Sequence, residues 1–178
     1  MEQDKNRVSS GISFVFINTG MESQDNEKPI YAIGEVAGKL GISVETIRLY
    51  ERQGLIIISK SAKGQRVYSE SDIERLTCIR TAINELKISI EGIRRMQSMV
   101  PCWSHIHCPE DQREECPAFL RASGGCWTYK HAENECAALD CRSCKVYLLS
   151  GTCENIKTLI YKDILPQPGN HRQQEDEL

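Results

Sequence analysis

Eight of the nine cysteines lie between Cys102 and Cys153, and only Cys78 lies elsewhere. Over the same stretch the apolar periodicity typical of helices and strands disappears, and Cys, Pro, Gly, His and Trp dominate. A segment of this composition cannot bury enough apolar side chains for an ordinary core, so it needs covalent or metallic cross-links to stay ordered. In an oxidising compartment the pattern would indicate disulfides, whereas in a reducing cytosol it indicates metal ligands or redox chemistry. We therefore expect residues 101–153 to form a small, irregular, cysteine-rich metal or redox sensor domain.

The rest of the chain bears on the compartment and on the domain boundaries. No apolar run approaches the roughly 20 residues that a membrane span needs. The short apolar run at 12–17 follows a segment with as many acids as bases, which is not typical of a signal peptide. We expect a cytoplasmic protein without membrane contact. Residues 1–28 are polar and lack a sustained period, which predicts a disordered tail, and residues 154–178 are predicted to be a short helix and a polar tail.

Two short helices are predicted at the start of the segment 29–100. Apolar residues recur at helical spacing over 33–40, where Gly41 ends the first helix. Ser43 can cap a second helix that runs to about Gln53, and Gly54 closes it. The intervening turn, 41–43, has the length and the glycine expected between the helices of a helix-turn-helix.

A hairpin and two longer helices follow. The β-prone run 55–58, a turn that contains Gly64, and the short run 66–68 predict a two-stranded wing. Ser69 and Asp72 form a capping box at the start of a third helix, whose predicted apolar stripe is Ile73, Leu76, Ile79, Ile83 and Leu86. A fourth helix is predicted from Ser89 to Pro101. The expected fold is mainly α: an N-terminal winged helix-turn-helix over 29–100, followed by the small irregular cysteine-rich domain.

Charge and side-chain chemistry in 29–100 indicate a DNA-binding surface. The whole chain has a net charge of −3, but this segment holds eleven Lys and Arg against eight Asp and Glu. Guanidinium groups read guanine bidentately or bind phosphate, and hydroxyls suit phosphate contacts. Tyrosines in these positions suit packing equally well. The candidate DNA-binding residues on the second helix and the wing are Thr46, Arg48, Tyr50, Arg52, Lys63, Arg66 and Tyr68.

Residues 31–98 resemble the DNA-binding domain of the mercury-resistance-regulator (MerR) family. The resemblance rests on the motifs at 31–37, 41–56, 64–68 and 71–76, in the order that the family has. It implies a homodimer that binds a palindrome in double-stranded promoter DNA, between the two promoter elements. The dimer distorts this spacer DNA, which affects RNA polymerase indirectly. It places Thr46, Arg48 and Tyr50 on recognition-helix contacts and Arg66 and Tyr68 on wing contacts.

The sequence departs from the family in three places. Leu49 stands where an aromatic residue is common, and Ile57 and Ile58 replace a usual proline. Family members also continue into a long helix that pairs in the dimer, whereas Pro101 interrupts this chain and no heptad run follows. Dimerisation therefore has to use the cysteine-rich segment, residues 154–165 or another surface.

The clustered thiols are candidate metal ligands, since thiolates bind soft and borderline metals. The gaps of four and two residues between Cys136, Cys141 and Cys144 match plant-type iron–sulfur spacing, so an iron–sulfur cluster is the preferred cofactor. The alternatives are zinc, with His105, His107 or His131 able to replace a sulfur, a metal-free thiol–disulfide switch, and a toxic heavy metal. The candidate ligands are Cys102, Cys108, Cys116, Cys126, Cys136, Cys141, Cys144 and Cys153.

Two Cys-Trp pairs begin at Cys102 and Cys126, and the stretch that ends at 141–147 resembles the two-CW type of cysteine-rich module. That resemblance implies a domain boundary and no defined chemistry. The sequence thus favours a DNA-binding transcription regulator, not an enzyme, whose cysteine-rich domain senses a signal. Two alternatives stay open: a zinc-stabilised adaptor without DNA binding, and a small iron–sulfur or thiol redox protein. Thioredoxin-like chemistry is disfavoured because the Cys141/Cys144 pair is not set in alternating strands and helices.

Overall fold

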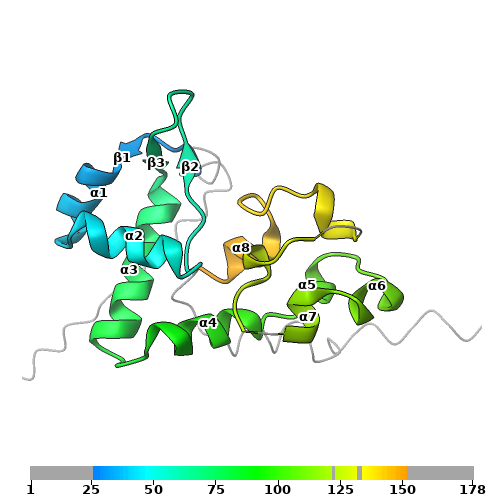
Figure 1. Ribbon diagram of the computed structural model, residues 1–178. Helices are drawn as coiled ribbons and strands as arrows, with labels where there is room; N and C mark the ends of the chain where they lie inside the picture. The colour runs from blue at the N-terminus through cyan, green and yellow to red at the C-terminus, as the bar shows by residue number, and fades with distance from the viewer. Residues whose placement is uncertain (1–25, 122, 132–133, 152–178) are drawn as a thin grey trace, which may run out of the picture.

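The structure is a computed structural model that describes residues 26–121, 123–131 and 134–151. A helical N-terminal part with a small sheet adjoins a second part made of short helical turns (Figure 1). The elements in chain order are β1 (Tyr31–Ala32), α1 (Ile33–Leu40), α2 (Val44–Arg52), β2 (Ser59–Lys60), β3 (Arg66–Tyr68), α3 (Glu70–Asn84), α4 (Ile90–Ser98), α5 (Cys102–His105), α6 (Glu110–Glu114), α7 (Pro117–Arg121), η1 (Cys126–Thr128), η2 (Glu135–Ala138) and α8 (Lys145–Leu149).

The helix-turn-helix is confirmed, and local signals explain its ends. Gly41 ends α1 with a φ of 61°, a left-handed conformation that glycine adopts without a steric penalty. Ser43 caps α2, because its hydroxyl accepts a hydrogen bond from the backbone N–H of Thr46 at 3.0 Å. The predicted capping box of α3 is also present: Ser69 Oγ accepts from the N–H of Asp72, and the Asp72 carboxylate accepts from the N–H of Ser69.

The three-stranded antiparallel sheet has the order β1-β3-β2. Tyr31 pairs with Tyr68, and Ser59 pairs with Val67. The wing is confirmed, but its first strand lies at 59–60 and not at 55–58. Leu55 and Ile56 are buried in the core instead, and side chains from the second half of the molecule bind the backbone around them, as described below.

One apolar core lies beneath α1, α2, α3 and the first turns of α4. Its fully buried members are Val36, Ile47, Leu55, Tyr68 and Leu76, each with 0% of its surface exposed. The predicted stripe on α3 is wrong at Leu86: α3 ends at Asn84, and Leu86 is 65% exposed. α4 ends before Pro101, as predicted.

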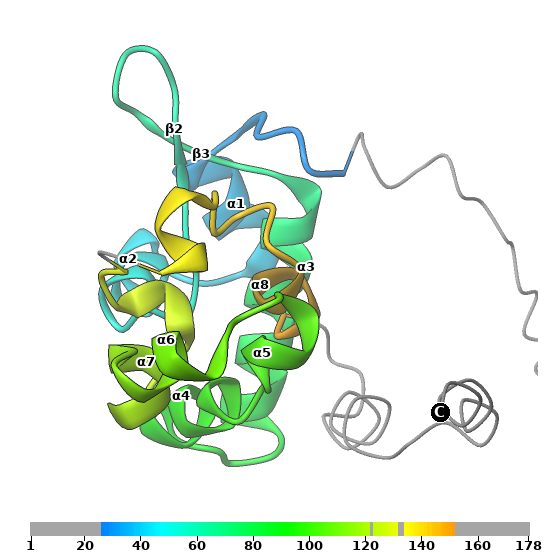
Figure 2. The ribbon, with the colours of Figure 1, turned by 90° about the vertical axis from the view of Figure 1, so that its right-hand side faces the viewer.

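The cysteine-rich part contains no regular helix longer than five residues among its described positions. The helices α5, α6, α7 and α8 lie to the right of α2 and α3 in Figure 1, so they face the viewer in the view turned by 90° (Figure 2). No helix in the described part of the chain is both long enough and apolar enough to cross a bilayer. The predicted helix at 154–165 lies outside the described residues.

Candidate nucleic-acid interface and thiol site

The helix α2 has one face in the core and one in solvent. Ile47 is 0% exposed and anchors the inner face. On the outer face the side chains of Arg48 and Arg52 are 47% and 56% exposed. Thr46 is partly buried in the first turn of the helix, where its hydroxyl is 2.8 Å from Ser43 Oγ. The structure therefore brings two of the predicted DNA-binding residues, Arg48 and Arg52, together on the exposed side of one helix.

Glu45 holds the two arginines of this face. Its carboxylate accepts a hydrogen bond from Arg52 at 2.9 Å, and Arg48 lies 3.5 Å away. The hydrogen bond from Arg52 is the main cause that lowers the pKa of Glu45. Because both ion pairs are exposed, they are weak and screened by salt, so a phosphate or a base edge can displace Glu45 from either guanidinium.

The wing projects beyond the sheet as a tight hairpin between β2 and β3 (Figure 1). Its loop is closed by a hydrogen bond from the N–H of Ser61 to the carbonyl of Gln65 at 2.8 Å. Gly64 has a φ of 75°, which favours glycine at this point of the turn. Lys63 is exposed in the same loop, so its ammonium group is available to a phosphate.

Arg66 has a different environment from the one the sequence suggested. It forms a bidentate ion pair with Glu51 of α2, with donor–acceptor distances of 2.8 and 3.1 Å. This pair raises the pKa of Arg66 and ties strand β3 to the recognition helix. Sequence reasoning missed Glu51, because fifteen residues separate the partners and no local pattern links them.

Two of the residues predicted to contact DNA lie in the interior of the structure. Tyr50 is 5% exposed and Tyr68 is 0% exposed, and both belong to the hydrophobic core. Tyr50 shares the inner face of α2 with Ile47, and Tyr68 faces inward from β3. Burial raises the pKa of Tyr68 to about 12. Neither ring is on the surface that presents Arg48, so the packing role is the one that the geometry supports.

Seven of the eight predicted metal ligands are described, and all seven carry free thiols. Cys153 lies outside the described residues. Four thiols line one small cavity with the rings of Trp127 and Tyr147: Cys126, Cys136, Cys141 and Cys144. The other three, Cys102, Cys108 and Cys116, do not line it. Cys78 on α3 is disulfide-bonded and so does not belong to this set of free thiols.

The four thiols of the cavity are partly buried. Burial, with smaller contributions from neighbouring thiols, raises the pKa of Cys126 to about 12 and that of Cys136 to about 11. Thiols of this kind are inert as nucleophiles without a metal or a nearby cation. Within the described ranges, no three His, Cys, Asp or Glu side chains are arranged so that they hold a metal ion as they stand.

His131 is held by hydrogen bonds on both ring nitrogens. Its Nε2 is 3.0 Å from the carbonyl oxygen of Cys126, and its Nδ1 is 3.3 Å from Nδ2 of Asn134. Cys116 Sγ lies 3.9 Å from the same Nδ1. The ring therefore braces the loops around Cys126, and both nitrogens are engaged.

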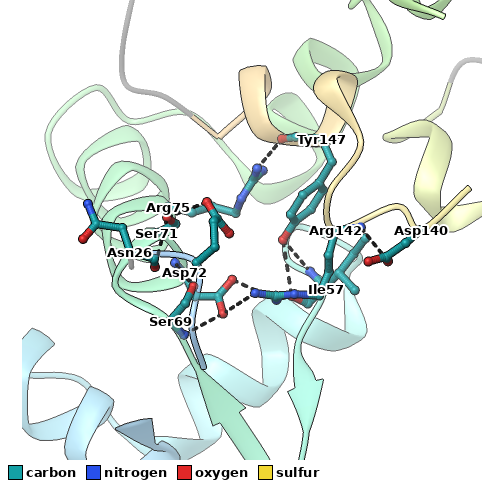
Figure 3. A network of polar contacts seen from close by, with 10 residues as sticks. Asn26, Ile57, Ser69, Ser71, Asp72, Arg75, Asp140, Arg142 and Tyr147 are labelled. Carbon is teal, nitrogen blue, oxygen red and sulfur yellow. Dashed lines mark hydrogen bonds and ion pairs between the residues drawn. The ribbon is translucent and has the colours of Figure 1, made fainter. Parts of the chain in front are cut away.

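The cysteine-rich part binds the N-terminal part through a polar network that the sequence did not predict (Figure 3). Arg142 donates two hydrogen bonds of 3.0 Å to the carboxylate of Asp72 and a third to the carbonyl of Ile57. The side chains of Arg142 and Asp72 are only 16% and 3% exposed. An ion pair so well shielded holds two parts of the chain that are seventy residues apart.

Two aromatic residues bind the segment that links α2 to β2. The hydroxyl of Tyr147 accepts a hydrogen bond from the N–H of Ile57 at 2.9 Å, and the indole N–H of Trp127 donates to the carbonyl of Gly54 at 2.8 Å. Arg75 of α3 lies over the Tyr147 ring at 3.8 Å and donates to its backbone carbonyl. These bonds engage backbone groups of Gly54 and Ile57, which are then not available to a neighbouring strand.

Comparison with known proteins matches residues 31–100 to the family model described as MerR HTH family regulatory protein. Among curated proteins, the chain is 37% identical over 84 residues to the HTH-type transcriptional regulator ZntR of Escherichia coli (strain K12), an alignment that covers 47% of this chain and 59% of the relative. It is 39% identical over 71 residues to the mercuric resistance operon regulatory protein of Bacillus cereus, covering 39% of this chain and 53% of the relative.

A third relative, the nodulation protein NolA of Bradyrhizobium sp. (strain NC92), is 41% identical over 66 residues, covering 36% of this chain and 27% of the relative. The chain thus spans less than two thirds of the length of these relatives. No solved structure matches significantly. The two-CW resemblance of the cysteine-rich part stays a prediction.

Proposed function

Because residues 31–100 form a helix-turn-helix domain of the MerR family, we propose that this protein is a transcription regulator that binds double-stranded promoter DNA. One observation carries the proposal: the solvent face of α2 presents Arg48 and Arg52, while its other face is packed in the core. An α-helix fits the major groove of B-DNA, where arginine reads guanine bidentately.

A side-chain contact links the wing to the recognition helix. The Arg66–Glu51 ion pair ties β3 to α2, so it restricts the movement of the wing that carries Lys63 relative to Arg48 and Arg52. Phosphate contacts from the wing then set the register in which α2 enters the groove. Of the predicted site, we retain Thr46, Arg48, Arg52 and Lys63 as contacts, and Arg66 as a positioning residue.

The relatives extend this proposal to the signal and to the assembly. One of them is named as a mercuric resistance operon regulatory protein, which favours a thiolate-bound metal as the signal for the cysteine-rich part. We propose that the metal state of this part decides whether the homodimer distorts its palindromic site, with an indirect effect on RNA polymerase. A regulator of this kind acts where the chromosome lies, in the cytoplasm.

Selection from a pool of random duplexes tests the DNA-binding proposal. The full chain is expected to enrich an inverted repeat, and binding to that duplex, followed by fluorescence anisotropy, is expected to weaken steeply as salt rises. Arg52→Ala should lower affinity, whereas Arg121→Ala, a change at an exposed cation on α7, should not. If no sequence is enriched and binding is equal for all duplexes, the adaptor alternative replaces the regulator.

A further inference from the structure

The four-thiol cavity has the ligand set of a tetrahedral metal site. It is lined by Cys126 at the start of η1, Cys136 in η2, and Cys141 and Cys144 just before α8. Cys141 and Cys144 lie on one turn, closed by a hydrogen bond from the N–H of Cys144 to the carbonyl of Cys141 at 3.3 Å. Two thiols on one turn together with two from other loops are the arrangement of four-cysteine zinc sites.

The size of the cavity favours one ion over a cluster. Its volume is about 10 Å³, which is room for about one water-sized sphere. A single zinc-class ion fits this space once the sulfurs turn inward to bond lengths of about 2.3 Å. A two-iron cluster with its bridging sulfides needs η1, η2 and α8 to move farther apart than a single ion does. The small cavity therefore favours a single ion over the iron–sulfur cofactor that the cysteine spacing predicted.

The remaining polar group of the cavity does not compete as a ligand. Both ring nitrogens of His131 are engaged, one with the carbonyl of Cys126 and the other with Asn134. The histidine therefore orients the loop that carries Cys126, as residues around metal ligands commonly do. The four sulfurs are left as the donors.

We propose that Cys126, Cys136, Cys141 and Cys144 bind one divalent ion of the zinc class, and that Trp127 and Tyr147 transmit its presence to the DNA-binding part. Each thiol that binds releases its proton to solvent, and no electron is transferred. The two rings line the cavity and also bind the segment 54–57 at the end of α2. Inward movement of the neighbouring sulfurs therefore acts on the backbone that positions the recognition helix against the wing.

Metal titration of the reduced, metal-free full chain tests the site without DNA. Zn²⁺ is titrated in competition with a chelator, and Co²⁺ serves as a spectroscopic substitute, since tetrahedral thiolate coordination gives intense absorption. We expect one ion per chain that depends on the four thiols. Cys136→Ser and Cys144→Ser should each weaken Zn²⁺ binding at least tenfold, whereas Cys108→Ser, a change outside the cavity, should not. Circular dichroism of the metal-free variants separates ligand loss from unfolding.

Tryptophan fluorescence tests the coupling, because the chain has only Trp103 and Trp127. Zn²⁺ should change the emission of Trp103→Phe, which retains Trp127, and should leave that of Trp127→Phe unchanged. The transmission step rests on the proposed DNA binding: Trp127→Phe should keep its Zn²⁺ affinity but lose most of the effect of Zn²⁺ on duplex affinity. Three results would each overturn the site, whatever the DNA result. They are no binding of Zn²⁺, a loss of Zn²⁺ affinity in Cys108→Ser equal to that in the cavity variants, and an anaerobically purified protein with iron and sulfide on these cysteines.

Discussion

The buried ion pair between Asp72 and Arg142 gives the sharpest test of how the two parts of the chain are joined. We consider Arg142→Leu, which keeps much of the side-chain volume but removes the guanidinium. Asp72 is then left 3% exposed, with the backbone N–H of Ser69 as its remaining partner at 3.0 Å. The variant therefore places an uncompensated carboxylate in a shielded site.

Removing one partner of a buried ion pair typically costs about 3–5 kcal/mol. Asp72 keeps its capping hydrogen bond and lies in the first turn of α3, where the helix dipole favours a negative charge. We therefore expect a loss near the lower end, about 3 kcal/mol in the free energy of unfolding. With a denaturant slope of about 2 kcal/mol per molar urea, the midpoint should fall by about 1.5 M.

Urea unfolding followed by circular dichroism measures this loss, with Arg121→Leu at an exposed site as the matched control. In the double variant Asp72→Asn/Arg142→Leu neither partner of the pair leaves its charge behind, so it should regain about 1–2 kcal/mol over Arg142→Leu alone. A loss within about 0.5 kcal/mol of the control, or a double variant less stable than Arg142→Leu, would refute the idea that this pair joins the two parts.

Three further predictions concern the recognition helix and the wing. Gly54→Ala should lower stability by about 1–3 kcal/mol in thermal unfolding, because Gly54 has a φ of 72° and a Cβ there would lie 2.5 Å from Thr128 Cγ2. The control is Gly34→Ala on α1, which has open space around it and should be neutral or stabilising. Equal effects of the two substitutions would contradict the reasoning. The Tyr68 hydroxyl is buried without a hydrogen-bond partner among the described residues. Tyr68→Phe should therefore add up to about 1 kcal/mol to the free energy of unfolding and leave duplex affinity unchanged. Weaker DNA binding by this variant would restore Tyr68 as a contact. Arg66→Ala should cost less than about 1 kcal/mol in urea unfolding, because its ion pair with Glu51 is partly exposed. The same variant should weaken duplex binding, because the wing is no longer tied to α2. Unchanged duplex affinity would remove the positioning role of Arg66.

Local signals allowed most of the N-terminal fold to be predicted. Gly41, Ser43 and the Ser69–Asp72 box fix helix ends through contacts within four residues, and the structure has all three. The stripe on α3 failed at Leu86 because the helix ends two residues earlier, at Asn84, which periodicity alone does not reveal.

The failures in the site have a common physical origin in long-range contacts. The run 55–58 has strand propensity, but Tyr147 and Arg142 bind the backbone of Ile57, and Trp127 binds the carbonyl of the preceding Gly54, all from more than seventy residues away. Likewise, a tyrosine on a recognition helix has the same local pattern whether it faces the core or DNA, and only the assembled core places Tyr50 inside. The cysteine spacing predicted thiolate chemistry, but the spacing carries no information on the volume that the thiols enclose.

The DNA-binding account is tested most directly by the base specificity of Arg48. Duplex affinity is measured by anisotropy for the wild type and Arg48→Ala, on the selected inverted repeat and on duplexes with single base-pair changes. If Arg48 reads a base, the variant should lose about 1–3 kcal/mol on the selected duplex and should no longer discriminate at one position of each half-site. Equal affinity and unchanged discrimination in the two proteins would contradict the placement of this face of α2 in the major groove.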